Sequence, residues 1–234
     1  MLMTTPTTGY QLLLPQHRDD PLYHNYYRWR RACGDFLILD NGACEGKLAT
    51  AVQLMDMATR YMVNEVVIPD TLLDGDATVQ QAYKFEVVTR QWPQFRYMAV
   101  AQGQTYEGLL TCIDALAALP YVHTLAIPRH VENTVGPGTR YRLVEYISAE
   151  CEQDIHLLGT NPMHMQELRA FGHFYRRFGV RGIDTASPYY YTMANKSLLA
   201  EAEERPKDYF TREVPNGELL LLNLAIMKEW VYGQ

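Results

Sequence analysis

The chain has 234 residues, with 21 Lys plus Arg against 27 Asp plus Glu, so its formal net charge is −6. Hydrophobic residues make up 47% and charged residues 21%, a globular composition that excludes a disordered, collagen-like or disulfide-stapled chain. No apolar run reaches the ~18 residues needed to cross a membrane, and residues 1–9 lack a secretion signal. We therefore expect a cytoplasmic protein with no membrane partner.

Short apolar runs recur along the chain, and most of them end in a polar or turn residue. They lie at 10–14, 36–39, 65–68, 97–101, 122–127, 155–158 and 180–183. The residues that follow the last six runs stand at positions 40, 70, 102, 128, 159 and 184. Successive positions in this series are 25 to 32 residues apart, close to the ~30 residues that a strand plus a returning helix occupies. Because the runs are continuous rather than alternating, they predict parallel strands that are buried on both faces.

Helical spacing of apolar residues fills the gaps between these runs. Asp76 and Thr105 are the expected N-caps of two of the helices. The other predicted helices span 47–62, 139–147, 161–178 and 218–232. The whole chain, 1–234, is therefore predicted to be one α/β domain, a (β/α)8-type TIM barrel that is irregular or incomplete because an eighth strand is not evident. An open doubly wound sheet is the alternative, but no GxGxxG follows an early strand to support its dinucleotide-binding form.

Polar residues stand where several of the predicted strands end. Asp40, Asp70, Gln102 and Asp184 are expected to meet at one mouth, because working residues of parallel barrels lie at the C-terminal strand ends. Two carboxylates facing one pocket suit sugar chemistry, in which one attacks the anomeric carbon and the other handles a proton. The rival reading is a Mg²⁺ site acting on a phosphorylated small molecule. The amide of Gln102 offers a donor and an acceptor, which favours reading a purine edge.

Five short strings carry a resemblance to a known family. They are LDNGA (39–43), VVIPD (66–70), VAQGQTYE (100–107), IHLLGTNP (155–162) and GIDTASP (182–188). In order and spacing they resemble the tRNA-guanine transglycosylase superfamily. The family's Cys-rich zinc module is absent from this sequence, and its Ser-Gly-Gly turn is replaced by Asn41-Gly42-Ala43. The short chain without the module resembles the phage-type branch, which exchanges guanine in DNA for a 7-deazaguanine.

The resemblance implies a role for each matching residue. Asp184 is the nucleophile and Asp40 the second catalytic residue, while the base pocket contains Asp70, Gln102, Gly103, Leu158 and Gly159. The implied reaction replaces guanine in DNA with a 7-deazaguanine, such as 7-cyano-7-deazaguanine (preQ0), through a covalent aspartyl-glycosyl intermediate. The implied partners are DNA and the free base. No cofactor and no metal are expected, and a phage-encoded enzyme would work in the cytoplasm of the infected bacterium.

A cluster of aromatic and basic residues at 26–31 is a candidate for contact with a nucleic-acid strand. Its expected contact residues are Arg28, Trp29, Arg30 and Arg31. Three alternatives stay open at this point: a transglycosylase that acts on tRNA, a metal-dependent barrel enzyme, and a nucleic-acid-binding relative without catalytic activity.

Overall fold

The computed structural model describes residues 9–160, 167, 169–170, 174–200 and 216–232. The chain divides into two compact units, of which one spans Thr8–His156 and the other includes the chain from Leu157 onward. Each unit is described by itself below. The single domain expected from the sequence stays a prediction.

Five parallel strands form the frame of the first unit. They are β1 (Tyr10–Leu13), β2 (Phe36–Leu39), β3 (Glu65–Val67), β4 (Arg96–Val100) and β5 (Thr124–Pro128). Each pairs in parallel with the next, for example with Ile38 opposite Glu65 and Val66 opposite Tyr97. Strand β6 (Asp154–Leu158) comes next along the chain, and β7 (Val180–Ile183) belongs to the second unit. The seven predicted strands are confirmed, with ends shifted by two residues or fewer.

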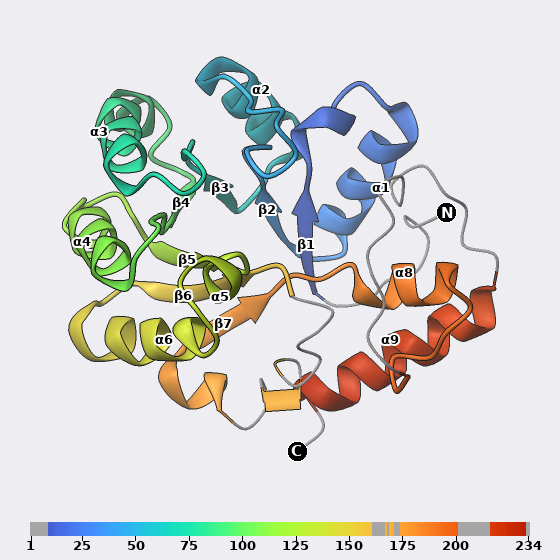
Figure 1. The fold of residues 1–234 in the computed structure, drawn as a ribbon. Helices are drawn as coiled ribbons and strands as arrows, with labels where there is room; N and C mark the ends of the chain where they lie inside the picture. The colour runs from blue at the N-terminus through green and yellow to red at the C-terminus, as the bar shows by residue number, and fades with distance from the viewer. Residues whose placement is uncertain (1–8, 161–166, 168, 171–173, 201–215, 233–234) are drawn as a thin grey trace. The chain divides into compact units, whose positions relative to one another are not determined.

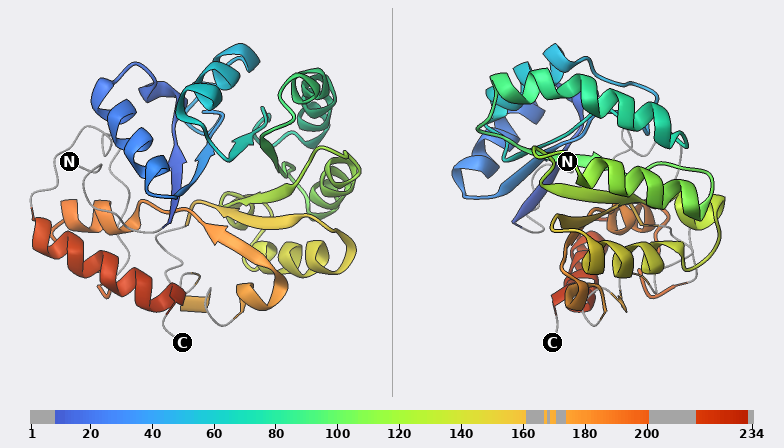
Figure 2. Two further views of the ribbon diagram at one scale, coloured as in Figure 1. Left: turned by 180° about the vertical axis from the view of Figure 1, so that it is seen from behind. Right: turned by 90° about the vertical axis from the view of Figure 1, so that its left-hand side faces the viewer.

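Helices alternate with the strands. They are α1 (Pro21–Ala32), α2 (Ala51–Tyr61), α3 (Gly75–Gln91), α4 (Tyr106–Ala117), the single turn α5 (Val131–Thr134) and α6 (Thr139–Glu150), with a short 3₁₀ turn, η2, at Pro15–His17. Figures 1 and 2 show α1 to α4 on the outer side of β1 to β5. Parallel strands in chain order with intervening helices confirm the α/β class, an incomplete barrel of the (β/α)8 type.

Local capping explains where these helices begin. Thr105 caps α4, as predicted, by accepting a hydrogen bond from the Gly108 amide at 3.1 Å. The predicted cap at Asp76 was wrong, because Asp74 accepts from the Ala77 amide at 2.9 Å and the helix begins at Gly75. Helix α1 was not predicted, although Asp20 followed by Pro21 is a favourable cap and first-turn pair.

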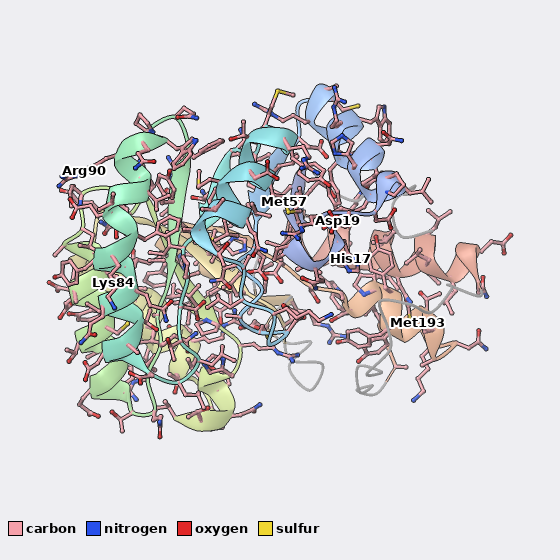
Figure 3. The ribbon with its side chains drawn as sticks, turned by 90° about the horizontal axis from the view of Figure 1, so that it is seen from above. His17, Asp19, Met57, Lys84, Arg90 and Met193 are labelled. Atoms are coloured by element: carbon pink, nitrogen blue, oxygen red, sulfur yellow. The ribbon has the colours of Figure 1, made fainter. Side chains whose placement is uncertain are left out.

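The core of the first unit lies between the strands and the inner faces of the helices. On α2, Leu54 and Met57 are buried against the strands, and Figure 3 labels Met57. The same figure labels Lys84 and Arg90, which mark the exposed face of α3. The opposite face of α3 buries Ala82 and Phe85, so this helix has the amphipathic pattern that anchors a helix on a sheet.

The second unit continues from β6 into β7, α8 (Ser187–Met193) and α9 (Gly217–Tyr232). Helices α8 and α9 pack together through Tyr190, Tyr191 and partners that include Trp230. Buried Asn223 connects α9 to α8 and to the chain after it, since it donates to Thr192 Oγ1 at 3.0 Å and accepts from the Leu198 amide at 2.8 Å. The helix predicted at the C-terminus is therefore confirmed.

The helix predicted for residues 161–178 lies largely outside the described residues. Its final turn is the 3₁₀ helix η4 (Tyr175–Phe178), which ends at Gly179 with φ of 76°, a left-handed conformation that favours glycine. Within the part of the chain that the structure describes, no helix combines the length and the apolar character that crossing a membrane requires.

Candidate active site at the strand ends

Polar side chains that follow four successive strands form a hydrogen-bonded row in the first unit. Asn41 follows β2, Asp70 follows β3, Gln102 follows β4 and His130 follows β5. Their neighbours in the row are joined directly, at distances of 2.6 Å (Asn41 to Asp70), 2.5 Å (Gln102 to Asp70) and 3.1 Å (His130 to Gln102). The row arises because the carboxyl ends of neighbouring parallel strands meet at one edge of the sheet.

The carboxylate of Asp70 is at the centre of this row and is only 4% exposed. Its Oδ1 accepts a hydrogen bond from Asn41 Nδ2, and its Oδ2 accepts one from Gln102 Nε2. Burial raises the pKa of Asp70 above its ordinary value, although both amides act in the opposite direction by stabilising the charged form. Each carboxylate oxygen can accept a second hydrogen bond, so the group keeps the capacity to accept from a ligand.

Both amides are held in one orientation by their own oxygen atoms. Asn41 Oδ1 accepts from the Ala43 amide at 2.8 Å, and Gln102 Oε1 accepts from the Leu73 amide at 3.0 Å. Gln102 Oε1 also lies 3.1 Å from Nε2 of His130, and a carbonyl oxygen only accepts, so this histidine nitrogen donates. The NH₂ groups of Asn41 and Gln102 are therefore directed at Asp70.

His130 is suited to this donor role. Burial lowers the pKa of its imidazole, and the charges of Arg129 and Arg140 act in the same direction. The neutral ring that results carries one hydrogen, and the contact with Gln102 places this hydrogen on Nε2. Leu73, the other donor to Gln102, has a φ of 63°, an unusual left-handed conformation for a leucine.

Asp40 has a different environment from Asp70. It is half-buried, and its Oδ2 accepts from the amide of Gly42 at 3.3 Å. The contact from the β2 loop to Asp70 comes from Asn41, the next residue along the chain. Gly42 has a φ of 81°, and a Cβ atom there would lie 2.4 Å from the carbonyl oxygen of Lys47. Only glycine fits this turn, which shapes the loop that carries both polar residues.

Glycine also permits close packing around Gln102. A Cβ atom on Gly103 would lie 3.0 Å from the backbone nitrogen of Leu109, so this glycine allows the loop after β4 to approach helix α4. A Cβ atom on Gly75 would lie 2.7 Å from the carbonyl oxygen of Gln102. These positions explain how the Gln102 backbone is fixed, while contact between Gly103 and a base stays a prediction.

Asp184 and Gly159 meet in the second unit, where Asp184 directly follows β7. Its Oδ1 accepts from the Gly159 amide at 3.0 Å, and its own amide donates to the carbonyl of Leu157 at 3.2 Å. Gly159 has a φ of 67°, and Leu158 is the half-buried last residue of β6. The loop after β6 thus holds the carboxylate that the sequence predicts to be the nucleophile.

The predicted nucleic-acid residues lie on helix α1, with differing exposure. Arg28 is exposed, Trp29 is 50% exposed and Arg31 is half-buried. Arg30 instead is 7% exposed, and its Nε lies 2.5 Å from Oδ2 of Asp35. Because this buried ion pair uses its guanidinium within the fold, we remove Arg30 from the expected contact surface.

The sequence interpretation missed Asn41 and His130, which frame Asp70 and Gln102. A signal for His130 existed, since it stands two residues beyond β5 just as Gln102 stands two residues beyond β4. Within the described ranges, no three His, Cys, Asp or Glu side chains are grouped so that they could hold a metal ion.

Comparison with known proteins adds no family assignment. No protein-family model matches the chain, and a search of curated proteins found no match.

Proposed function

We propose that the chain is a base-exchange transglycosylase that replaces guanine in DNA with a 7-deazaguanine through a covalent aspartyl-glycosyl intermediate. The observation that carries the proposal is the buried carboxylate of Asp70, held by two amides at the ends of adjacent strands. Burying a carboxylate costs free energy of folding, so a buried carboxylate with hydrogen-bonding capacity to spare is a candidate for a ligand-binding role. The motif resemblance supplies the substrate class.

Hydrogen-bond complementarity supports guanine as the base that Asp70 reads. The N1–H and the exocyclic amine of guanine are adjacent donors, which pair with the two oxygens of a carboxylate. One hydrogen of the Gln102 NH₂ group is directed at Asp70. In the proposed complex the other donates to the carbonyl oxygen of the base. This donor stabilises negative charge that develops on the purine as it leaves.

The proposed chemistry is a double displacement at C1′. The carboxylate of Asp184 attacks C1′, the bond from C1′ to N9 breaks, and the electron pair leaves with guanine, which takes up a proton from water. The incoming 7-deazaguanine then attacks C1′ through N9 and gives its N9 proton to Asp40, which relays it to water, while the ester bond to Asp184 breaks. Two inversions preserve the β-configuration, as in retaining glycosidases. The Gly159 amide supports this role by fixing one oxygen of the nucleophile.

The surface of α1 supports a nucleic-acid substrate. Trp29 is half-exposed beside exposed Arg28, and an aromatic ring next to a cation suits a base and its phosphate. A target guanosine in a duplex must be flipped out of the base stack before the enzyme can act at its C1′, or the substrate must be single-stranded.

Nucleoside analysis by mass spectrometry tests the proposal. The chain is expressed in bacteria supplied with 7-cyano-7-deazaguanine, and nucleosides from DNA and from RNA are analysed separately. We expect a 7-deazaguanine deoxynucleoside that disappears in Asp184→Ala and persists in Asp56→Asn, which changes an exposed carboxylate paired with Arg60. A modified nucleoside found only in RNA would identify the tRNA reaction instead. Absence of any modified nucleoside with the folded wild-type chain would refute the proposal.

A further inference from the structure

Four hydroxyl groups lie together in the second unit beside the loop that carries Asp184. Thr160, Ser187 and Tyr190 are buried, and Thr185 is half-buried. The Thr185 Oγ1 lies 2.5 Å from the Thr160 Oγ1 and 2.7 Å from the Ser187 Oγ. The Ser187 Oγ completes the ring at 3.1 Å from the Thr160 Oγ1 and lies 2.8 Å from the Tyr190 hydroxyl.

A count of hydrogens shows that this network can satisfy itself. Each hydroxyl group supplies one hydrogen, and the four groups make four mutual contacts. In one arrangement that satisfies all four contacts, the Tyr190 hydroxyl donates to Ser187 and the three remaining hydrogens run around the ring in one direction. Thr185 Oγ1 also accepts from the Ser187 amide at 3.0 Å. Removal of the Thr185 hydroxyl takes an acceptor from the Ser187 amide and a partner from the Thr160 and Ser187 hydroxyls.

The ring members stand directly beside the residues that hold the carboxylate. Thr160 follows Gly159, whose amide donates to Asp184, and Thr185 follows Asp184 itself. The short contact between the two threonines thus links the loop after β6 to the loop after β7 at the point where the amide meets the carboxylate.

We propose that this hydroxyl ring positions the Asp184 carboxylate, with Thr160, Thr185 and Ser187 as positioning residues. The ring fixes the distance between the two loops, and the Gly159 amide then fixes the rotation of the carboxylate. The catalytic consequence rests on the proposed function, in which Asp184 is the nucleophile. A misplacement of a reacting group by ~1 Å lowers a rate by up to ~100-fold. The geometric consequence, loss of the Gly159 contact, does not depend on that function.

The test compares three single variants of the full chain. Thr185→Val removes the hydroxyl and keeps the shape, whereas Thr185→Ser keeps the hydroxyl. Thr192→Val is the matched control, because Thr192 is a buried threonine of the same unit whose hydroxyl donates to the Pro188 carbonyl and accepts from Asn223, both outside the ring. The first readout is hydrogen exchange of the Gly159 amide, measured by NMR against the Ala194 amide, which donates to the Tyr190 carbonyl.

We expect Thr185→Val to speed Gly159 exchange at least ~10-fold relative to Ala194, and Thr185→Ser and Thr192→Val to leave that ratio unchanged. The second readout is base exchange, for which Thr185→Val lowers kcat by about 10- to 100-fold with KM for the base unchanged. If Thr185→Val does not fold, Thr160→Val replaces it in the same two measurements.

Three outcomes decide the proposal. Gly159 exchange at the wild-type ratio in the valine variant would overturn it, and so would an equal rise of that ratio in Thr192→Val, which would show that the effect does not require the loss of a ring hydroxyl. If the wild-type chain catalyses no base exchange while Thr185→Val still releases the Gly159 amide, the proposed function fails and the positioning role is upheld.

Discussion

Substitution of Asp70 by asparagine separates the two roles that this residue can have, in stability and in ligand recognition. Two amide donors face the carboxylate, and each hydrogen bond to a charged group contributes about 1.5–3 kcal/mol. Removing a carboxylate from water costs several kcal/mol. Burial is the largest cause of the raised pKa of Asp70, so the free-energy cost of removing the carboxylate from water exceeds the stabilisation that the two amide hydrogen bonds provide. The ionised side chain therefore lowers the stability of the fold.

The sign of the pH dependence follows from the raised pKa. The stability that a protonated Asp70 provides is fully present below the pKa of the unfolded chain and is lost as the pH rises through the folded-state pKa. Asp70→Asn lacks this titration, and its side-chain NH₂ group meets an NH₂ donor of Asn41 or Gln102 at every pH. As the pH rises from 4 to 7 we therefore expect wild type to lose stability relative to Asp70→Asn by on the order of 1 kcal/mol, about 2–4 °C in Tm for a chain of this length.

Denaturant unfolding of both proteins between pH 4 and pH 7 measures this difference, with base exchange assayed on the same samples. We expect Asp70→Asn to lose activity and to lose the pH dependence of stability that the buried carboxylate causes. The reasoning is refuted if both proteins share one pH profile of stability.

Three further substitutions test other parts of the account. Arg30→Ala should destabilise the fold by about 3–5 kcal/mol in denaturant unfolding, because it leaves the buried carboxylate of Asp35 without its cation. Arg28→Ala should leave stability within ~0.5 kcal/mol of wild type and should reduce the salt dependence of DNA binding. Gly42→Ala should lower Tm and activity strongly, because the new Cβ atom would collide with the Lys47 carbonyl. Gly46 also has a positive φ but has open space around it, so Gly46→Ala should have the smaller effect in the same assays. Equal effects of the two substitutions would contradict the steric argument. His130→Phe should raise KM for the base about 10-fold, because Gln102 loses a donor that orients its amide, and an unchanged KM in steady-state kinetics would exclude that role.

The sequence predicted the strands well because each is a continuous apolar run, the pattern that burial on both faces requires. It predicted Asp70 and Gln102 as neighbours because their strands are adjacent and parallel. It did not predict that Asn41, rather than Asp40, contacts Asp70. Consecutive residues of a loop direct their side chains differently, and the spacing of strand ends in the sequence does not tell which of two adjacent side chains faces Asp70.

The exposure of a charged residue on a helix was also beyond the sequence. Arg30 sits within a basic and aromatic cluster that predicts a surface, yet it pairs with Asp35 beyond the helix end. The backbone fold past Ala32 creates that pairing, and composition carries no information about it. Similarly, the hydroxyl ring unites Thr160 with Thr185, which are 25 residues apart in the chain.

The central claim, that Asp184 forms a bond to C1′ of a DNA guanosine, is tested most directly by trapping the intermediate. The protein is incubated with a guanine-containing oligodeoxynucleotide in the absence of incoming base, denatured, and digested for peptide mass spectrometry. The account predicts release of guanine and a deoxyribosyl adduct on the peptide that contains Asp184, absent from Asp184→Asn. An adduct on a different residue, or an adduct that persists in Asp184→Asn, would contradict it.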